Sequence, residues 1–385
     1  MTRKKVLIVG MLDSIHLARW LEQFTSEDID FTLFPSKRFR RPHPKLKSLL
    51  TSNHASANYA LVSFRFVNYS GYFDYLENEA PRFFGLHNSR FRKLKKLLSR
   101  NQFNYIHAIE IQGAGYLLSG INSDVLKFTK VILTNWGSDI YYFKSFTNHI
   151  VKIKQILKIA DYYSAECLRD YRLARELGFS GIELPCIPNA GGFELPDLIN
   201  GSTPPSSRSQ ILIKGYGGKF GRADLPISLI PLISDRYPSY TYLVYSVTPD
   251  ILALIKQLPK EIKRKIRISK VTRILPQREM LNQFKASRIY IGCSESDGIS
   301  TSFLEALVNG AYPIQTGTSC ANEWVQKGAS ASIVKLVPAE LQAAIENSLS
   351  DDHLVDQAAT KNRLLAEREL SSQVIKRQAL TYYSV

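Results

Sequence analysis

The sequence predicts an α/β protein built from two doubly wound halves, each a parallel sheet with helices on both faces. Short apolar runs that suit buried strands alternate with helical patterns along most of the chain. The alternation stops after 188–192 and restarts at 211, beyond the Gly/Ser/Pro-rich stretch 201–207. The 385 residues suit two or three domains, and 44% hydrophobic with 22% charged residues is ordinary for a globular protein.

The first half begins as strand, helix, strand. An apolar run at 5–10 predicts the first strand, and Ser14 suits the N-cap of a helix whose apolar stripe ends at residue 24. Glycine at 178 fits the end of another helix. The remaining elements expected in this half are strands at 31–34, 104–109 and 131–135 and helices at 149–160 and 167–177.

The second half repeats the pattern after the linker. The expected strands lie at 211–215, 240–247, 266–271, 288–293 and 312–316. The expected helices lie at 223–233, 250–258, 278–286 and 301–308, with further helical patterns from 338 onward. We therefore expect domains at 1–200 and 201–365, and a C-terminal helix over 366–385 that can cross back to the first domain.

Positive charge is concentrated in one part of the chain. The 50 Lys and Arg exceed the 34 Asp and Glu by 16, which favours acidic partners such as nucleotides, nucleic acid or an anionic membrane. A basic insertion at 35–100 holds 14 basic and 3 acidic side chains, with the densest runs at 37–47 and 90–98. The second run has apolar residues at helical spacing between its cations. It predicts either a basic amphipathic helix that lies on anionic lipid or a solvated helix that packs through those apolar residues.

Signals for targeting and for disulfides are few. No apolar run approaches the roughly 18 residues that span a bilayer, and no secretory leader is recognisable at the start. The four cysteines form no C-x-x-C pair, so neither a disulfide framework nor a zinc site is indicated. We expect a cytoplasmic location, with the option of peripheral attachment to the inner face of the cytoplasmic membrane through 37–47 and 90–98.

A glycine-rich turn at 214–222 follows the first strand of the second half and opens a helix. Glycines such as Gly215 and Gly217 let a backbone approach a phosphate closely, and a helix N-terminus favours negative charge. Lys219 and Arg222 add full charges that suit a diphosphate. The spacing does not fit the G-x-G-x-x-G fingerprint of dinucleotide-binding proteins, which argues against NAD.

A second polar constellation follows the strand at 288–293. Asp297 stands in the loop and Glu305 in the next helix, where a carboxylate can bridge two ribose hydroxyls. The alternative is a solvated Glu305 on a helix capped by Ser300. The N–H groups at the helix start can hold a diphosphate or a sugar hydroxyl, and they belong to Gly298, Ile299, Ser300 and Thr301.

The segments 296–307 and 309–316 resemble the donor-binding core of glycosyltransferase family 4. That family comprises retaining, nucleotide-sugar-dependent enzymes of the GT-B fold, in which two Rossmann-like domains face one another across a cleft. Its signature has two acids separated by seven residues. Asp297 stands where glutamate is usual, which implies a contact to the donor sugar, and Glu305 stands in the place that implies a contact to the ribose. The likeness is close in the second half and loose in the first.

The resemblance extends to two other loops. The glycine-rich turn is similar to the family's, with Tyr216 in place of an early arginine and Arg222 near the later lysine. This implies a diphosphate contact for Arg222, with Lys219 as its neighbour. The segment from Trp136 to Asp139 is similar to a His-Gly-x-Asp segment, with tryptophan in place of histidine, and implies a catalytic place for Asp139.

Four further side chains are assigned, with Trp136, to the acceptor side. Ser14 and His16 occupy the first strand–helix loop, which shapes that side in the family. His107 and Glu110 lie at the end of a predicted strand, and we expect both to face the cleft. No group of residues has metal-ligand spacing, so neither a metal nor another cofactor is expected.

These observations predict a retaining glycosyltransferase that moves a sugar from a nucleoside diphosphate donor to a glycan or lipid-linked acceptor. The family implies polysaccharide or lipopolysaccharide assembly as its setting. Two alternatives stay open: a sugar-nucleotide epimerase of the same fold, and a non-catalytic partner protein that has kept the fold. Specific nucleic-acid binding is not expected, since no interleaved aromatic pattern accompanies the charge.

Overall fold

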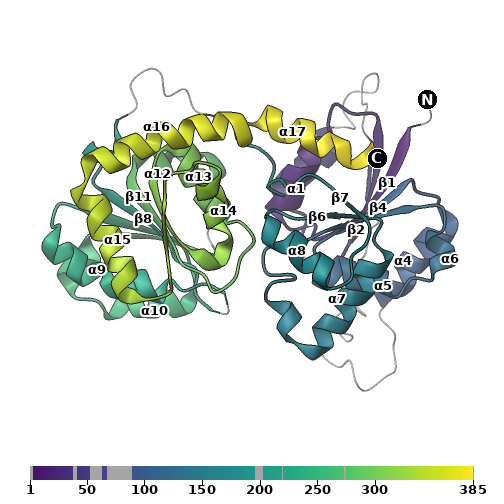
Figure 1. Cartoon of the computed structure of the whole chain (residues 1–385), viewed down its shortest axis with the longest axis horizontal. Coiled ribbons are helices and arrows are strands. Elements are labelled where there is room, and N and C mark those ends of the chain that lie inside the picture. Colours follow the sequence, from purple (N-terminus) through teal and green to yellow (C-terminus); the bar gives the residue numbers. More distant parts are fainter. Residues whose placement is uncertain are drawn as a thin grey trace. The chain divides into compact units, whose positions relative to one another are not determined.

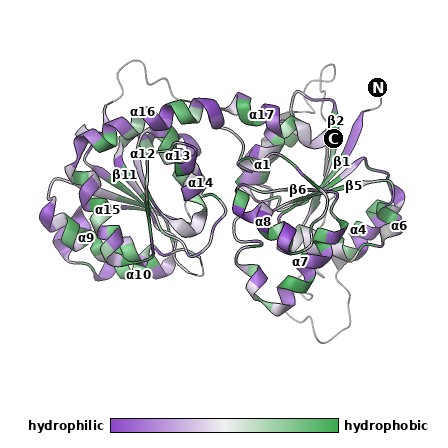
Figure 2. Cartoon of the chain, in the orientation of Figure 1, coloured by the Kyte–Doolittle hydropathy of each residue, from purple (hydrophilic) through white to green (hydrophobic). Residues whose placement is uncertain are grey.

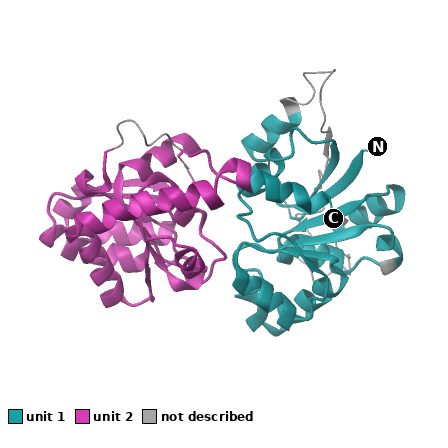
Figure 3. Cartoon of the chain, turned by 45° about the horizontal axis from the view of Figure 1, so that its top comes forward, with its two compact units in different colours: residues 1–191, 375–385 teal, residues 192–374 magenta. Residues whose placement is uncertain are grey.

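The computed structural model describes residues 3–37, 41–52, 63–66, 89–195, 203–218, 220–272 and 275–384. The chain divides into two compact units (Figures 1 and 3). Unit 1 comprises residues 1–191 and 375–385, and unit 2 comprises residues 192–374. Each unit is built on one parallel sheet between two layers of helices, which confirms the α/β class and the two doubly wound halves.

The described sheet of unit 1 has seven strands in the order β3-β2-β1-β4-β5-β6-β7. The strands are β1 (Lys4–Gly10), β2 (Ile29–Pro35), β3 (Ser63–Phe66), β4 (Tyr105–Ile109), β5 (Lys130–Thr134), β6 (Tyr162–Ser164) and β7 (Ile182–Glu183). The helical segments are α1 (Ile15–Glu22), α2 (Pro44–Ser52), α4 (Ser89–Arg100), the π-helical turn η1 (Ile111–Gly115), α5 (Tyr116–Ser119), α6 (Ser123–Leu126), η2 (Phe143–Ser145), α7 (Thr147–Ile159) and α8 (Leu168–Glu176).

The described sheet of unit 2 has six strands in the order β10-β9-β8-β11-β12-β13. The strands are β8 (Gln210–Lys214), β9 (Thr241–Val247), β10 (Ile266–Lys270), β11 (Ser287–Gly292), β12 (Tyr312–Thr316) and β13 (Ser332–Val334). The helical segments are η3 (Pro205–Ser207), α9 (Asp224–Arg236), α10 (Pro249–Gln257), α11 (Lys260–Arg264), α12 (Gln277–Ala286), α13 (Thr301–Asn309), η4 (Gly317–Ser319), α14 (Ala321–Gln326), α15 (Pro338–Ser350) and α16 (Asp352–Glu369).

Alternate strand residues supply the two layers of each core, because successive side chains point to opposite faces of a sheet. In unit 2, Ile211 and Ile213 pack in one layer, whereas Leu212 packs in the other. The helices that cover the sheets carry both hydrophobic and hydrophilic residues along their length (Figure 2). Each helix thus buries one stripe and leaves the other to solvent, as the sequence periodicity predicts.

The basic run at 90–98 forms α4. Leu94 is fully buried and Leu98 nearly so, and both belong to the core of unit 1. The cations Arg92, Lys93, Lys95 and Lys96 are exposed. The helix therefore packs on unit 1 through its apolar residues and leaves these four cations exposed, an arrangement that both interpretations share. None of the described helices is long and apolar enough to cross a membrane.

The boundaries of the two units differ from those expected at 200 and 365. Phe193 forms a parallel bridge with Ser371 and packs in the core of unit 2, so unit 2 begins at residue 192. Residue 365 falls inside α16, an uninterrupted helix of 18 residues. The chain re-enters unit 1 at residue 375, within α17 (Ser372–Leu380), and ends in the turn η5 (Thr381–Tyr383).

Candidate functional site

The glycine-rich turn and the loop at 293–300 meet at one edge of the unit 2 sheet. β8 and β11 are neighbours in the sheet, and the strands that follow each of them lie on opposite sides. At such a switch point the loops after the two strands separate, and open α/β sheets bind ligands there. The turn follows β8 and the loop follows β11, so the structure brings together the two constellations expected from the sequence.

Backbone contacts join the turn to the loop. They are the bridge between Gly221 and Ser294 and the hydrogen bonds from Arg222 N to Cys293 O (3.0 Å) and from Glu295 N to Phe220 O (2.8 Å). The turn also closes tightly on itself at Gly221. A Cβ atom at this position would lie 2.0 Å from the carbonyl oxygen of Tyr216, so only glycine fits.

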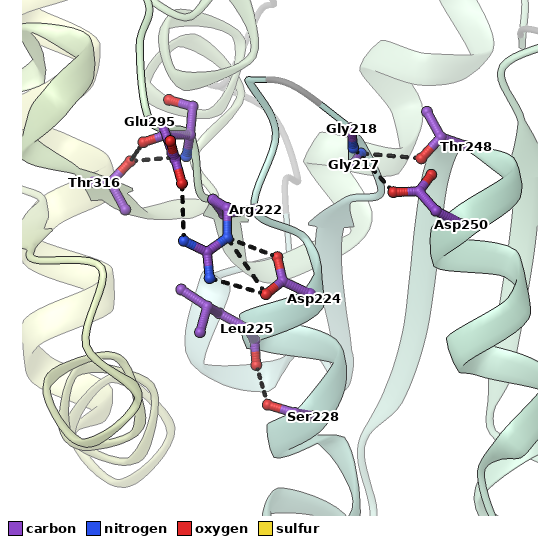
Figure 4. A network of polar contacts seen from close by, with 11 residues as sticks. Gly217, Gly218, Arg222, Asp224, Leu225, Ser228, Thr248, Asp250, Glu295 and Thr316 are labelled. Carbon is purple, nitrogen blue, oxygen red and sulfur yellow. Dashed lines mark hydrogen bonds and ion pairs between the residues drawn. The ribbon is translucent and has the colours of Figure 1, made fainter.

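Arg222 lies between two carboxylates at this edge (Figure 4). Its Nε and one terminal nitrogen each donate to Asp224 at 3.0 Å, and the other terminal nitrogen donates to Glu295 at 3.1 Å. The hydrogen bond to Asp224 is the main cause of the raised pKa of Arg222. Partly exposed ion pairs of this kind are worth only about 0–1 kcal/mol. A diphosphate with more than one negative charge can therefore compete for this guanidinium.

The N–H groups of Gly217 and Gly218 in the glycine turn already have partners within unit 2, so these amides are not directed at a diphosphate. Gly217 N–H donates to the hydroxyl of Thr248 at 3.0 Å, and Gly218 N–H donates to the carboxylate of Asp250 at 2.9 Å (Figure 4). Thr248 and Asp250 start α10 after the neighbouring strand β9. Sequence reasoning missed both, although a Thr-Pro-Asp segment directly after a predicted strand is a signal for such a role.

The N-terminus of α13 lies in the same loop. Ser300 occupies its N-cap position, but its side chain makes no capping hydrogen bond. The alternative of a helix that is capped by the Ser300 side chain is therefore not what the structure has. Asp297 accepts a hydrogen bond from Gly298 N–H at 2.9 Å, so this amide and this carboxylate are held together. The next N–H groups toward the helix belong to Ile299, Ser300 and Thr301.

Glu305 projects from the second turn of α13. It is half-buried, whereas Leu304 and Ala306 on either side are fully buried. Burial and the neighbouring Tyr290 are the larger causes of the raised pKa of Tyr245 on β9, and the negative charge of Glu305 raises it further. Lys219, the other cation expected to contact the diphosphate, lies outside the described residues.

Unit 1 has its own switch point, between β1 and β4. Ser14, in the loop after β1, caps α1 by accepting a hydrogen bond from His16 N–H at 3.2 Å. The ring of His16 meets Trp136, which follows β5, edge to face at 5.8 Å between centroids. The structure therefore brings together three of the residues assigned to the acceptor side.

Two buried carboxylates order the loops at this edge. Glu110 has a positive φ of 83° and accepts hydrogen bonds from the N–H groups of Gly113 and Ala114, which starts the π-helical turn η1. Asp139 accepts from Ile111 N–H at 2.8 Å and from Trp136 N–H at 3.0 Å. Non-glycine residues with positive φ and π-helical turns both concentrate at functional sites.

Burial raises the pKa of both carboxyls, and the nearby charge of Glu110 raises the pKa of Asp139 further. The pair therefore favours a state in which a proton is retained, because two ionised carboxylates in one buried place repel each other. Asp139 thus ties the loop after β4 to the loop after β5. Asp139 therefore positions these two loops through its hydrogen bonds. The catalytic role that the family resemblance implies for it stays a prediction.

His107 does not face open space, and that expectation is wrong. Its ring is fully buried, with Nδ1 at 2.8 Å from the hydroxyl of Tyr383 and Nε2 at 2.6 Å from the hydroxyl of Thr134. Burial lowers its pKa to about 3. Alternate residues of a buried strand point into the core. His107 is one of these residues of β4, and its ring contacts Tyr383 of the C-terminal segment there.

Comparisons with known proteins agree with this architecture. Residues 5–168 match the family described as glycosyl transferase 4-like. No curated protein sequence matches the chain. Among solved structures, HepE of Anabaena in complex with UDP and glucose has a TM-score of 0.67 and 13% identity, over 99% of this chain and 100% of that one.

Two further structures show the same likeness. A glycosyltransferase from Rickettsia africae has a TM-score of 0.65 and 16% identity, over 100% of this chain and 98% of that one. A variant of S. aureus TarM in complex with fondaparinux, alpha-GlcNAc-glycerol and UDP has a TM-score of 0.67 and 9% identity, over 99% and 100% of the two chains. These likenesses show that the chain has the two-domain α/β fold of the GT-B glycosyltransferases, and its residues 5–168 are similar to the glycosyl transferase 4-like family.

Proposed function

We propose that this protein is a glycosyltransferase that moves a hexosyl group from a nucleoside diphosphate donor, with retention, to a glycan or lipid-linked acceptor in polysaccharide or lipopolysaccharide assembly. One observation supports the donor class above all others. The glycine-rich turn and the loop that leads into α13 are joined at the switch point of unit 2. HepE, a structural neighbour, has been solved with UDP-glucose, so a UDP-sugar is the first donor to test.

The donor is held by unit 2 in this proposal. Glu305 accepts hydrogen bonds from the ribose hydroxyls, and the N–H groups at the start of α13 bind the diphosphate. Arg222 leaves Asp224 and Glu295 to pair with the same diphosphate. Lys219 adds a second positive charge, so the protein neutralises the leaving group without a metal ion.

The chemistry follows from the charge that develops on the leaving group. The bond between the anomeric carbon and the diphosphate oxygen breaks, and the diphosphate gains negative charge, which Arg222 and the amides stabilise. The acceptor oxygen forms the new bond on the same face, and its proton passes to the departing diphosphate. Asp297, held against Gly298 N–H, binds a hydroxyl of the donor sugar.

The acceptor is held by unit 1 in this proposal. His16 and Trp136 form an aromatic wall at the carboxyl edge of the sheet, and aromatic faces suit the C–H surfaces of sugars. Glu110 and Asp139 fix the loops around them. The exposed cations of α4 add an electrostatic contact to an anionic membrane surface that carries the acceptor.

The test needs no acceptor, because a retaining enzyme with a bound donor hydrolyses it slowly. Proton NMR follows the sugar that is released from UDP-glucose, UDP-N-acetylglucosamine and the matching GDP-sugars. The proposal predicts that the first-formed sugar keeps the anomeric configuration of the donor. An inverted sugar contradicts retention. An intact sugar nucleotide whose ring carbon has changed configuration indicates the epimerase instead, and an unchanged donor that binds indicates the non-catalytic protein.

A further inference from the structure

A second polar cavity lies wholly within unit 1, apart from the residues assigned to the donor. It has a volume of about 420 Å³ and opens between the segment after β2, the start of α4, the turn η1 with α5, and α7. β2 and β4 are parallel, so their following loops lie at the same edge of the sheet as His16 and Trp136. A cavity of this size can hold a small ligand.

The charge of the cavity is one-sided. Among the described residues that line it, Lys37, Arg90 and Lys152 are positive and none is negative. These three cations come from three separate elements. Arg90 is only 9% exposed, and its guanidinium donates to the backbone oxygen of Ser36 at 3.0 Å, so its orientation is fixed. Lys37 and Lys152 are exposed and can close over a ligand.

Neutral hydrogen-bonding groups complete the lining. Gln112 is held by a bond from its side-chain nitrogen to the backbone oxygen of Asp139 at 2.8 Å. The hydroxyl of Tyr116 lies 2.9 Å from Nδ1 of His149, and burial raises its pKa to about 12, so it stays a neutral phenol. The carboxylate of Glu110, which does not line the cavity, accepts hydrogen bonds from the N–H groups of Gly113 and Ala114.

We propose that this cavity binds the phosphate group of the acceptor, so that the acceptor of the reaction is a phosphorylated sugar or a lipid-linked sugar phosphate. A phosphate carries about −1.5 to −2 charges and several acceptor oxygens, and an arginine fork with two lysines suits that geometry. The inference rests on the proposed function, since it names the acceptor of the same reaction. The phosphate is held and takes no part in bond making.

Gln112 connects the cavity to the acceptor side. It lines the cavity and also bonds to Asp139, whose carboxylate positions Trp136. A phosphate held by Arg90 and Lys152 therefore places the attached sugar at the edge where His16 and Trp136 lie. Binding of the phosphate would accelerate the reaction, because an acceptor hydroxyl held in a fixed position reacts faster than a free one.

The experiment measures binding alone, with UDP present at saturation to occupy the donor site. Isothermal titration calorimetry is carried out with inorganic phosphate, a hexose 1-phosphate and a polyprenyl phosphate in detergent micelles. The variant Lys37→Gln/Lys152→Gln removes the two exposed cations and keeps the buried Arg90. Lys154→Gln/Lys158→Gln is the matched control, since both residues are exposed on α7 and do not line the cavity.

The hexose 1-phosphate is expected to bind the wild type and the control equally, and the cavity variant about tenfold or more weakly, as charge-assisted hydrogen bonds are lost. Tighter binding of the polyprenyl phosphate identifies a lipid-linked acceptor, and equal binding identifies a soluble one. Equal affinity of all three proteins for every phosphate compound, or no binding at all, overturns the inference. UDP binding is recorded separately, so loss of UDP binding counts against the proposed function and not against this cavity.

Discussion

Nδ1 of His107 lies 2.8 Å from the hydroxyl of Tyr383, across 276 residues of sequence. His107 stands on β4, in the middle of the unit 1 sheet, and Tyr383 stands two residues before the end of the chain. Both side chains are fully buried. Tyr382 and Tyr383 are therefore part of the core of unit 1, and the stability of that unit depends on them.

Removal of the Tyr383 hydroxyl is expected to destabilise unit 1. In Tyr383→Phe, Nδ1 of His107 loses its partner, and so does Nε1 of Trp20, which lies 3.3 Å from the same hydroxyl. Each buried polar group left unpaired costs about 1–3 kcal/mol. Denaturant unfolding should show a lower midpoint for this variant. Tyr216→Phe is the control, because that side chain is 43% exposed, and it should match the wild type.

The contribution of His107 to the stability of unit 1 is expected to fall below pH 6.5. The pKa of His107 falls from 6.5 to about 3 on folding, because burial disfavours the charged ring. Between these values the unfolded chain binds a proton that the folded chain does not, so each pH unit of acidification removes about 1.4 kcal/mol. The full contribution is present above pH 6.5 and is lost progressively down to pH 3.

The comparison that isolates this effect is with His107→Gln. That variant should be less stable than the wild type at pH 7, with a shallower loss between pH 6 and 4. Glu110 and Asp139, whose pKa values are raised, act in the opposite direction in both proteins and so cancel in the difference. Parallel curves of unfolding free energy against pH would show that His107 does not control the acid response.

Local pattern predicts much of this fold, and long-range pairing explains where it fails. The strands and helices follow from periodicities of a few residues, which the sequence displays directly. The place of His107 depends on Tyr383, which no local pattern connects with it. The amides of Gly217 and Gly218 are likewise bound by Thr248 and Asp250 at the start of α10, and only the sheet order reveals that β9, which precedes α10, lies beside β8.

Removal of one carboxylate beside Arg222 is expected to strengthen nucleotide binding. Glu295 competes with a diphosphate for the guanidinium, at 3.1 Å. Glu295→Gln removes its charge and should raise the affinity for UDP about two- to fivefold, the scale of a partly exposed ion pair. Glu279→Gln, an exposed change on α12, is the control. Weaker binding in Glu295→Gln would mean that Glu295 positions Arg222 rather than competing for it.

The cations of α4 are expected to control attachment to anionic lipid. The test variant changes four residues to serine: Arg92, Lys93, Lys95 and Lys96. Its binding to phosphatidylglycerol vesicles should fall well below that of the wild type, since each lost charge removes about 1 kcal/mol. A control removes the same charge from unit 2 by changing Lys256, Lys260, Lys263 and Arg264 to serine. Equal vesicle binding by both variants would show that the cations of α4 have no special role in lipid binding and are only solvated.

The most direct test of the account concerns Glu305 and the donor. Calorimetric titration with UDP compares the wild type, Glu305→Ala and Glu261→Ala, the last a removal of one exposed carboxylate on α11. Thermal unfolding without ligand establishes that all three are folded. UDP should bind the wild type and Glu261→Ala equally, and Glu305→Ala about tenfold or more weakly, because two ribose hydroxyls lose their acceptor. Equal affinity of all three proteins for UDP, or no binding to any of them, would contradict the proposed donor site in unit 2.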